Sequence, residues 1–113
     1  MADTFDAIVR HENGAAIVDL IGEINGTAET ALNAAYQSAS QENPDVVVLN
    51  FKKVVYINST GIALIVGLLA QARKSHRRLV VYGLSEHYQE IFRITRLSDF
   101  MQIYEDERSA LAG

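Results

Sequence analysis

The sequence predicts an α/β domain in which three to four helices cover a mixed sheet of four to five strands. The pair Asn13-Gly14 separates two apolar segments, as in a two-residue hairpin. The apolar run Val46–Phe51 is nearly continuous, which is typical of a strand buried on both faces. After the hairpin, segments of helical periodicity alternate three times with apolar strand segments. We therefore expect an N-terminal antiparallel hairpin followed by strands joined through crossover helices.

The first half of the chain contains the hairpin, one helix and the central strand. Loose alternation predicts strands over 4–12 and 15–21. Asn25-Gly26-Thr27 then offers capping residues for an amphipathic helix that continues to about Ser40. Asn43-Pro44 ends this helix before the central strand.

The second half repeats the alternation of helices and strands. A short apolar segment, Val54–Ile57, leads into Asn58-Ser59-Thr60-Gly61, where a second helix begins that continues to about His76. The remaining expected elements are a strand over Leu79–Tyr82, a third helix capped by Ser85 with Tyr88, Ile91, Phe92 and Thr95 on its apolar face, a short strand at Ile103-Tyr104 and a terminal helix over 106–111.

Length and composition favour a single domain over residues 1–113. The chain is 49% hydrophobic and has one proline, which leaves no linker, and it has no cysteine for a disulfide or a thiolate metal site. Its net charge of −4 and its short basic cluster over 73–78, which suits a helix C-terminus, argue against direct binding of nucleic acid. The first six residues lack the pattern of a signal peptide, and no apolar run is long enough for a membrane span. We therefore expect a cytoplasmic protein without membrane insertion.

Ser59 and Thr60 are the candidate modification site. They lie where a loop becomes a helix, and backbone N–H groups and the helix dipole favour an anion at such a place. The alternative is that Asn58 or Ser59 is simply the helix N-cap, which contributes about 1 kcal/mol.

The helix after this site is apolar on every side over 62–70. In so small a chain we expect one stripe of it, around Ala63 and Gly67, to face outward and bind a partner. A phosphoryl group beside that stripe would oppose apolar docking. The alternative is that the whole helix belongs to the core.

Catalysis and cofactor binding have no support in the sequence. A nucleophile elbow requires glycine where the chain has Ile57, and no motif links His11, His76 or His87 to Ser59. The three histidines lack metal-ligand spacing, and no glycine-rich phosphate loop occurs. A receiver domain is disfavoured because Asp45 opens the central strand and Asn50 closes it. We therefore expect neither an enzyme nor a bound metal or cofactor.

The sequence resembles the anti-sigma factor antagonists, which are built on the sulfate transporter and anti-sigma antagonist (STAS) domain. The resemblance spans nearly the whole chain, and its most specific part is Asn-Ser-Thr-Gly. The three segments that carry it are Ile21-Gly22-Glu23-Ile24-Asn25, the Asp45–Phe51 strand leading to Tyr56-Ile57-Asn58-Ser59-Thr60-Gly61-Ile62, and Leu79-Val80-Val81-Tyr82-Gly83-Leu84.

The resemblance implies a partner-switching function. In that family the unmodified antagonist binds an anti-sigma factor, which is a serine kinase, and releases a sigma factor; phosphorylation ends the complex and a PP2C-type phosphatase reverses it. Ser59 matches the phosphorylated serine, and Thr60 is the neighbouring candidate. The expected partner-binding residues are Asn25, Gly26, Tyr56, Asn58, Gly61, Ile62 and Val66.

The chain departs from the commonest family pattern at two positions. Asn58 and Asn25 stand where aspartates are usual, so two negative charges are absent while the capping oxygens remain. The alternative function is a STAS scaffold subunit of a signalling or transport complex, in which Ser59 is not phosphorylated.

Overall fold

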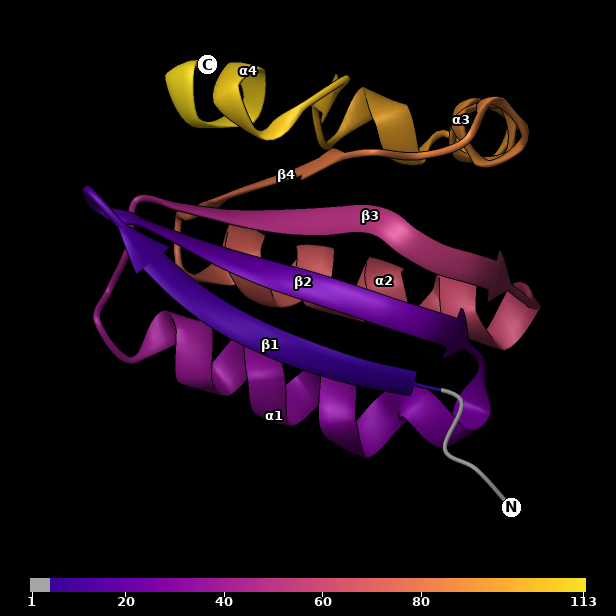
Figure 1. Ribbon diagram of the computed structural model, residues 1–113, viewed down its shortest axis with the longest axis horizontal. Helices are drawn as coiled ribbons and strands as arrows, with labels where there is room; N and C mark the ends of the chain where they lie inside the picture. Colours follow the sequence, from indigo (N-terminus) through magenta and orange to yellow (C-terminus); the bar gives the residue numbers. More distant parts are fainter. Residues whose placement is uncertain (1–4) are drawn as a thin grey trace.

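The computed structural model describes residues 5–113, and Thr4, which was predicted to open the first strand, lies outside the described residues. The chain alternates strands and helices (Figure 1). The elements in order are β1 (Phe5–Glu12), β2 (Ala15–Ile24), the 3-10 turn η1 (Gly26–Ala28), α1 (Glu29–Ser40), β3 (Val46–Ile57), α2 (Ser59–Lys74), β4 (Arg78–Tyr82), α3 (Glu86–Ile94), the 3-10 turn η2 (Leu97–Asp99), β5 (Ile103–Tyr104) and α4 (Glu107–Ala112).

The five strands form one mixed sheet in the order β1-β2-β3-β4-β5. β1 and β2 are antiparallel, and every later pair is parallel. Asn13 and Gly14 connect the hairpin with φ angles of 47° and 84°, the positive values that a type I′ turn requires. The predicted α/β class, the hairpin and the central position of β3 are confirmed.

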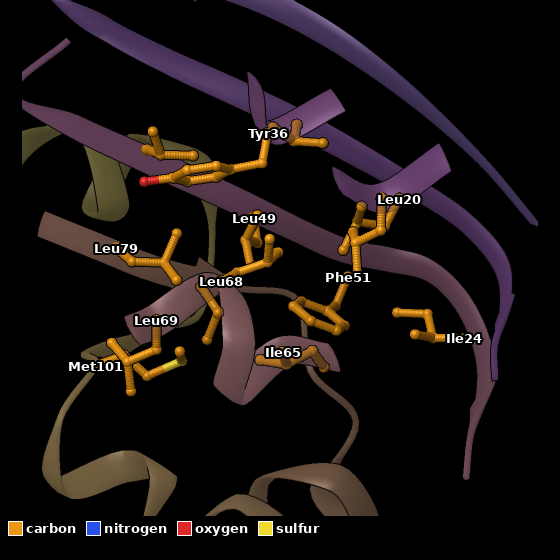
Figure 2. Close-up of a cluster of buried hydrophobic side chains, with 14 of the residues drawn as sticks. Leu20, Ile24, Tyr36, Leu49, Phe51, Ile65, Leu68, Leu69, Leu79 and Met101 are labelled. Atoms are coloured by element: carbon orange, nitrogen blue, oxygen red, sulfur yellow. The ribbon is translucent and has the colours of Figure 1, made fainter. Parts of the chain in front are cut away.

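The larger hydrophobic core fills one face of the sheet, where α1 and α2 lie (Figure 1). Figure 2 shows side chains from three elements converging in this core: Leu20 from β2, Phe51 from β3, and Ile65 and Leu68 from α2. Phe51 also meets Phe92 of α3 edge to face, with 6.0 Å between ring centroids. Burial of each such side chain contributes about 1.5–3 kcal/mol, so this face anchors α2 and the loop that precedes it.

The opposite face is covered in part by α4. A smaller cluster forms there, with Ile17, Val48 and Val80 of the sheet beneath Ala110 of α4. Figure 1 shows α4 on the other side of the sheet from α1 and α2. The two helical layers explain why the central part of β3 is apolar on both faces.

The central strand and the second helix differ from their predicted bounds, and β2 continues beyond its predicted end at Ile21. The segments Val46–Phe51 and Val54–Ile57 form one continuous strand, β3, because β2 extends to Ile24 and pairs with its second half. The second helix ends at Lys74 rather than His76. The cause is a left-handed φ of 57° at His76, after which the Arg77 N–H donates to the Ala72 carbonyl at 2.8 Å.

Candidate functional site

Asn58 directly follows β3 and caps α2. Its backbone is extended, and its Oδ1 accepts a hydrogen bond from the Gly61 N–H at 2.8 Å. The Asn58 carbonyl accepts the next donor, the Ile62 N–H, at 3.0 Å. Of the two predicted capping candidates, Asn58 is therefore the N-cap and Ser59 is the first helical residue.

Ser59 and Thr60 are both exposed to solvent. Within residues 5–113, neither hydroxyl takes part in a side-chain hydrogen bond. Because the first N–H groups of a helix have no partner in the helix, those of Ser59 and Thr60 also point outward. The candidate phosphoacceptor is thus a free hydroxyl at the electropositive end of a helix.

The first turn of α2 packs tightly against the end of β2. A Cβ atom at Gly61 would overlap the carbonyl oxygen of Ile24, and the same oxygen accepts the Asn58 N–H at 3.2 Å. Gly61 was predicted to be a partner-binding residue, and the structure places it in the buried interior. The absence of a side chain at Gly61 lets the helix approach the strand this closely.

Asn25 and Gly26, two of the expected partner-binding residues, lie beside this turn. A Cβ atom at Gly26 would lie 3.7 Å from Thr60 Cγ2, so the β2–α1 loop adjoins the start of α2. The Asn25 side chain points into its own loop, where its Oδ1 accepts hydrogen bonds from the Thr27 N–H at 2.9 Å and from the Thr27 hydroxyl at 2.6 Å. Asn25 thus shapes the loop that borders Thr60.

The outward stripe predicted on α2 is present. Val66 is 45% exposed, and Ala63, Gly67 and Ala70 are exposed as well, while Ile62 is half-buried. The other side of the helix, including Ile65 and Leu68, is fully covered. Ile62 and Val66 therefore present apolar surface one turn and two turns beyond Ser59.

An open groove of about 400 Å³ separates the start of α2 from α3. Residues from the end of β3, the first turns of α2, and α3 form its walls: Tyr56, Ile57, Asn58, Ser59, Ile62, His87, Tyr88, Ile91 and Thr95. Tyr56 is half exposed at this groove. Three of the predicted partner-binding residues, Tyr56, Asn58 and Ile62, line the groove together with Ser59.

Tyr88 is a site residue that the sequence did not identify. It was predicted on the apolar face of the third helix, and the structure adds a polar role: its hydroxyl oxygen accepts the Ile57 N–H at 2.9 Å. The sequence held one indication of this role, because a tyrosine on an apolar helix face carries a hydroxyl that needs a hydrogen-bond partner. Sequence alone could not place that partner at the end of β3.

The clearest charge cluster lies on the other face of the sheet. Arg10 donates to Asp19 at 2.7 Å and to Glu107 at 2.7 Å, and Tyr82 donates to Glu107 at 2.8 Å. Hydrogen bonding to Arg10 lowers the pKa of Asp19 and of Glu107, and burial together with Glu107 raises the pKa of Tyr82 to about 12. This cluster ties α4 to the hairpin and is separate from the Ser59 site.

His11, His76 and His87 are exposed, and His87 lines the groove beside Ser59. In the part of the chain that the structure describes, no cluster of three or more histidine, aspartate or glutamate side chains has the arrangement of a metal site. Over residues 5–113, no helix combines the length and the apolar character that a membrane crossing requires.

The chain matches the model of one known protein family. The model of the STAS domain matches residues 6–110. The chain belongs to the STAS domain family.

Relatives of this STAS domain have names that state a function. This chain is 30% identical over 82 residues to the anti-sigma-B factor antagonist of Listeria monocytogenes, and the match covers 73% of this chain and 72% of the relative. It is 32% identical over 84 residues to the anti-sigma-B factor antagonist of Staphylococcus epidermidis, covering 74% and 78% of the two chains.

Solved structures share the fold. An anti-sigma factor antagonist from Mycobacterium paratuberculosis superposes with a TM-score of 0.82 at 19% identity, over 96% of this chain and 92% of the other. The Bacillus cell fate determinant SpoIIAA in its phosphorylated form superposes with a TM-score of 0.72 at 18% identity, over 94% and 96% of the two chains. The STAS fold predicted from the sequence is confirmed.

Proposed function

We propose that this STAS domain is a cytoplasmic anti-sigma factor antagonist that acts by binding and catalyses no reaction itself. In its unmodified form it binds an anti-sigma factor that is a serine kinase, and a sigma factor is released. Phosphorylation of Ser59, with Thr60 as the neighbouring acceptor, ends the complex, and a PP2C-type phosphatase restores it. The names of the relatives, anti-sigma-B factor antagonists at about 30% identity, support this function.

One observation carries the proposal: Asn58 caps α2, so the hydroxyl of Ser59 is exposed and free of side-chain hydrogen bonds within the described residues. A phosphoryl group on that oxygen would lie at the positive end of the helix dipole, near outward-pointing N–H groups. The modified chain would therefore keep its fold. Modification would change the surface and leave the core intact.

The effect on the partner follows from the apolar residues beside Ser59. Ile62 and the half-exposed Val66 continue the surface along α2, and Tyr56 borders it. Phosphorylation adds about −1.5 to −2 charges at its edge. Burying that charge against an apolar partner costs several kcal/mol unless the partner supplies a cation. The unmodified form is thus the binding form.

The modification is tested by incubating the chain with the cognate anti-sigma factor kinase and ATP and locating phosphate by mass spectrometry. Ser59→Ala should abolish labelling, and Thr60→Ala should retain it. Undiminished labelling of Ser59→Ala would reject Ser59 as the acceptor.

The switch is tested by calorimetry with the same partner. Ser59→Asp should bind at least about tenfold more weakly than wild type, through the cost of burying charge. Equal affinity would reject the switch and favour a scaffold role in which Ser59 is not phosphorylated.

A further inference from the structure

The last part of β3 has a strand partner on one side only. Its pairing with β4 ends at Asn50 opposite Tyr82, whereas its pairing with β2 continues to Ile57 opposite Ile24. At Gly83 the chain turns away with a φ of +83°, close against the backbone of Lys52. Among the described residues, β3 therefore extends beyond Asn50 as an edge strand on the side that faces α3.

Tyr88 takes the place of the missing strand at the end of this edge. The Ile57 N–H donates to its hydroxyl oxygen at 2.9 Å, and the hydroxyl donates to the Ile57 carbonyl oxygen at 3.5 Å. One side chain thus satisfies both backbone groups of one residue, as a hydrogen-bonded residue of a neighbouring strand would. Ser85 caps α3 through the Tyr88 N–H at 3.3 Å, which fixes the helix turn that carries the ring.

Ile57 directly precedes the cap of α2, so this contact bears on Ser59. On the β2 side, the Asn58 N–H is held by the Ile24 carbonyl oxygen at 3.2 Å. On the α3 side, Tyr88 holds Ile57. The turn that presents Ser59 is therefore anchored from both sides, and the groove beside it leaves the hydroxyl accessible.

We propose that Tyr88 is a positioning residue for Ser59, which keeps the end of β3 and hence the acceptor hydroxyl in the place where a kinase can phosphorylate it. The inference rests on the proposed function. Phosphoryl transfer requires close alignment of the acceptor oxygen, and supporting hydrogen bonds from neighbouring side chains supply such alignment. Loss of the Tyr88 hydroxyl should thus slow transfer more than it weakens encounter with the kinase.

The test compares Tyr88→Phe with Tyr104→Phe. Both variants keep the ring and lose a hydroxyl. Tyr104 is half-buried on β5, and its hydroxyl donates an exposed hydrogen bond to Gln102 Oε1 at 2.7 Å, which makes it the matched control. Circular dichroism should show that both variants fold.

The first measurement needs no partner. Amide hydrogen exchange followed by NMR should show the Ile57 N–H exchanging at least about tenfold faster in Tyr88→Phe, because its acceptor is gone. Tyr104→Phe should leave that rate unchanged. An unchanged rate in Tyr88→Phe, or a loss of protection spread along all of α2, would overturn the positioning role.

The second measurement is steady-state phosphorylation of Ser59 by the anti-sigma factor kinase and ATP. For Tyr88→Phe, kcat should fall at least about fivefold while KM stays within about twofold of wild type. Tyr104→Phe should match wild type. If wild type is phosphorylated and Tyr88→Phe keeps its kcat, the inference about Tyr88 is wrong. If wild type is not phosphorylated at all, the proposed function itself fails.

Discussion

The backbone of Gly61 in α2 packs directly against the carbonyl oxygen of Ile24 at the end of β2. The same oxygen accepts the Asn58 N–H, so two successive parts of the turn that carries Ser59 converge on one backbone group of β2. Any side chain at position 61 would have to displace the helix or the strand. The location of Ser59 thus depends on the absence of a side chain two residues later.

Gly61→Ala should destabilise the fold. The added methyl group overlaps the Ile24 oxygen and lies 2.9 Å from Ile57 Cγ2, so we expect the free energy of unfolding to fall by about 2–3 kcal/mol. Gly67→Ala is the matched control in the same helix, because nothing lies within 4 Å of the added atom. It should raise the free energy of unfolding by about 0.5–1 kcal/mol through helix propensity. Urea unfolding measures both, and equal effects would contradict the packing argument.

Acid should weaken the link between α4 and the hairpin. Arg10 lowers the pKa of Asp19 and of Glu107 from ordinary values of 3.8 and 4.5. Above those values both carboxylates are charged and their stabilisation is complete. As pH falls below them, the unfolded chain takes up protons first and the stabilisation is lost. Asp19→Asn should lower the free energy of unfolding at neutral pH by about 1–2 kcal/mol.

The same variant should flatten the decrease in stability between about pH 5 and pH 3. Urea unfolding across that range checks this. Glu90→Gln is the control, because Glu90 and Arg93 form an exposed ion pair on α3 and its removal should change little. Wild-type stability that stays constant down to pH 3 would contradict the prediction.

Val66→Lys should weaken binding of the anti-sigma factor without disturbing the fold. Val66 is 45% exposed on the outer stripe of α2, so a charge there meets solvent in the free chain and apolar surface in the complex. We expect affinity to fall at least about tenfold. Ile8→Lys is the control: Ile8 is 49% exposed on β1 and lines the face with Arg10 and Asp19. Calorimetry measures both, and equal losses would place the partner elsewhere.

Most of the fold could be predicted because its signals are local. The Asn13-Gly14 turn, the continuous apolar run of β3 and the cap Ser85 each act within a few residues, and each lies where it was predicted. Boundaries set by pairing between distant segments were less predictable. β3 extends without a break to Ile57 because β2 pairs with it there, although Lys52 and Lys53 interrupt its apolar pattern.

The site was predictable in part for the same reason. Ser59 at a helix start and the apolar helix after it are visible in the sequence, and in the structure Ser59 and the expected stripe of α2 are exposed. Gly61 belongs to the same motif, but its close packing against Ile24 could not be predicted from the sequence, because it depends on contact between elements distant in the chain.

Turn chemistry, capping and hydrophobic periodicity are properties of neighbouring residues. The amino-acid sequence was therefore enough to predict the α/β class, the hairpin, a helix start capped by Asn58 or Ser59, and an apolar helix beside a modifiable serine. Only the folded chain shows that Gly61 is buried and that Tyr88 from α3 holds the end of β3. Those features depend on contacts between residues about thirty or more positions apart in the chain. The order and register of the strands bring these residues together.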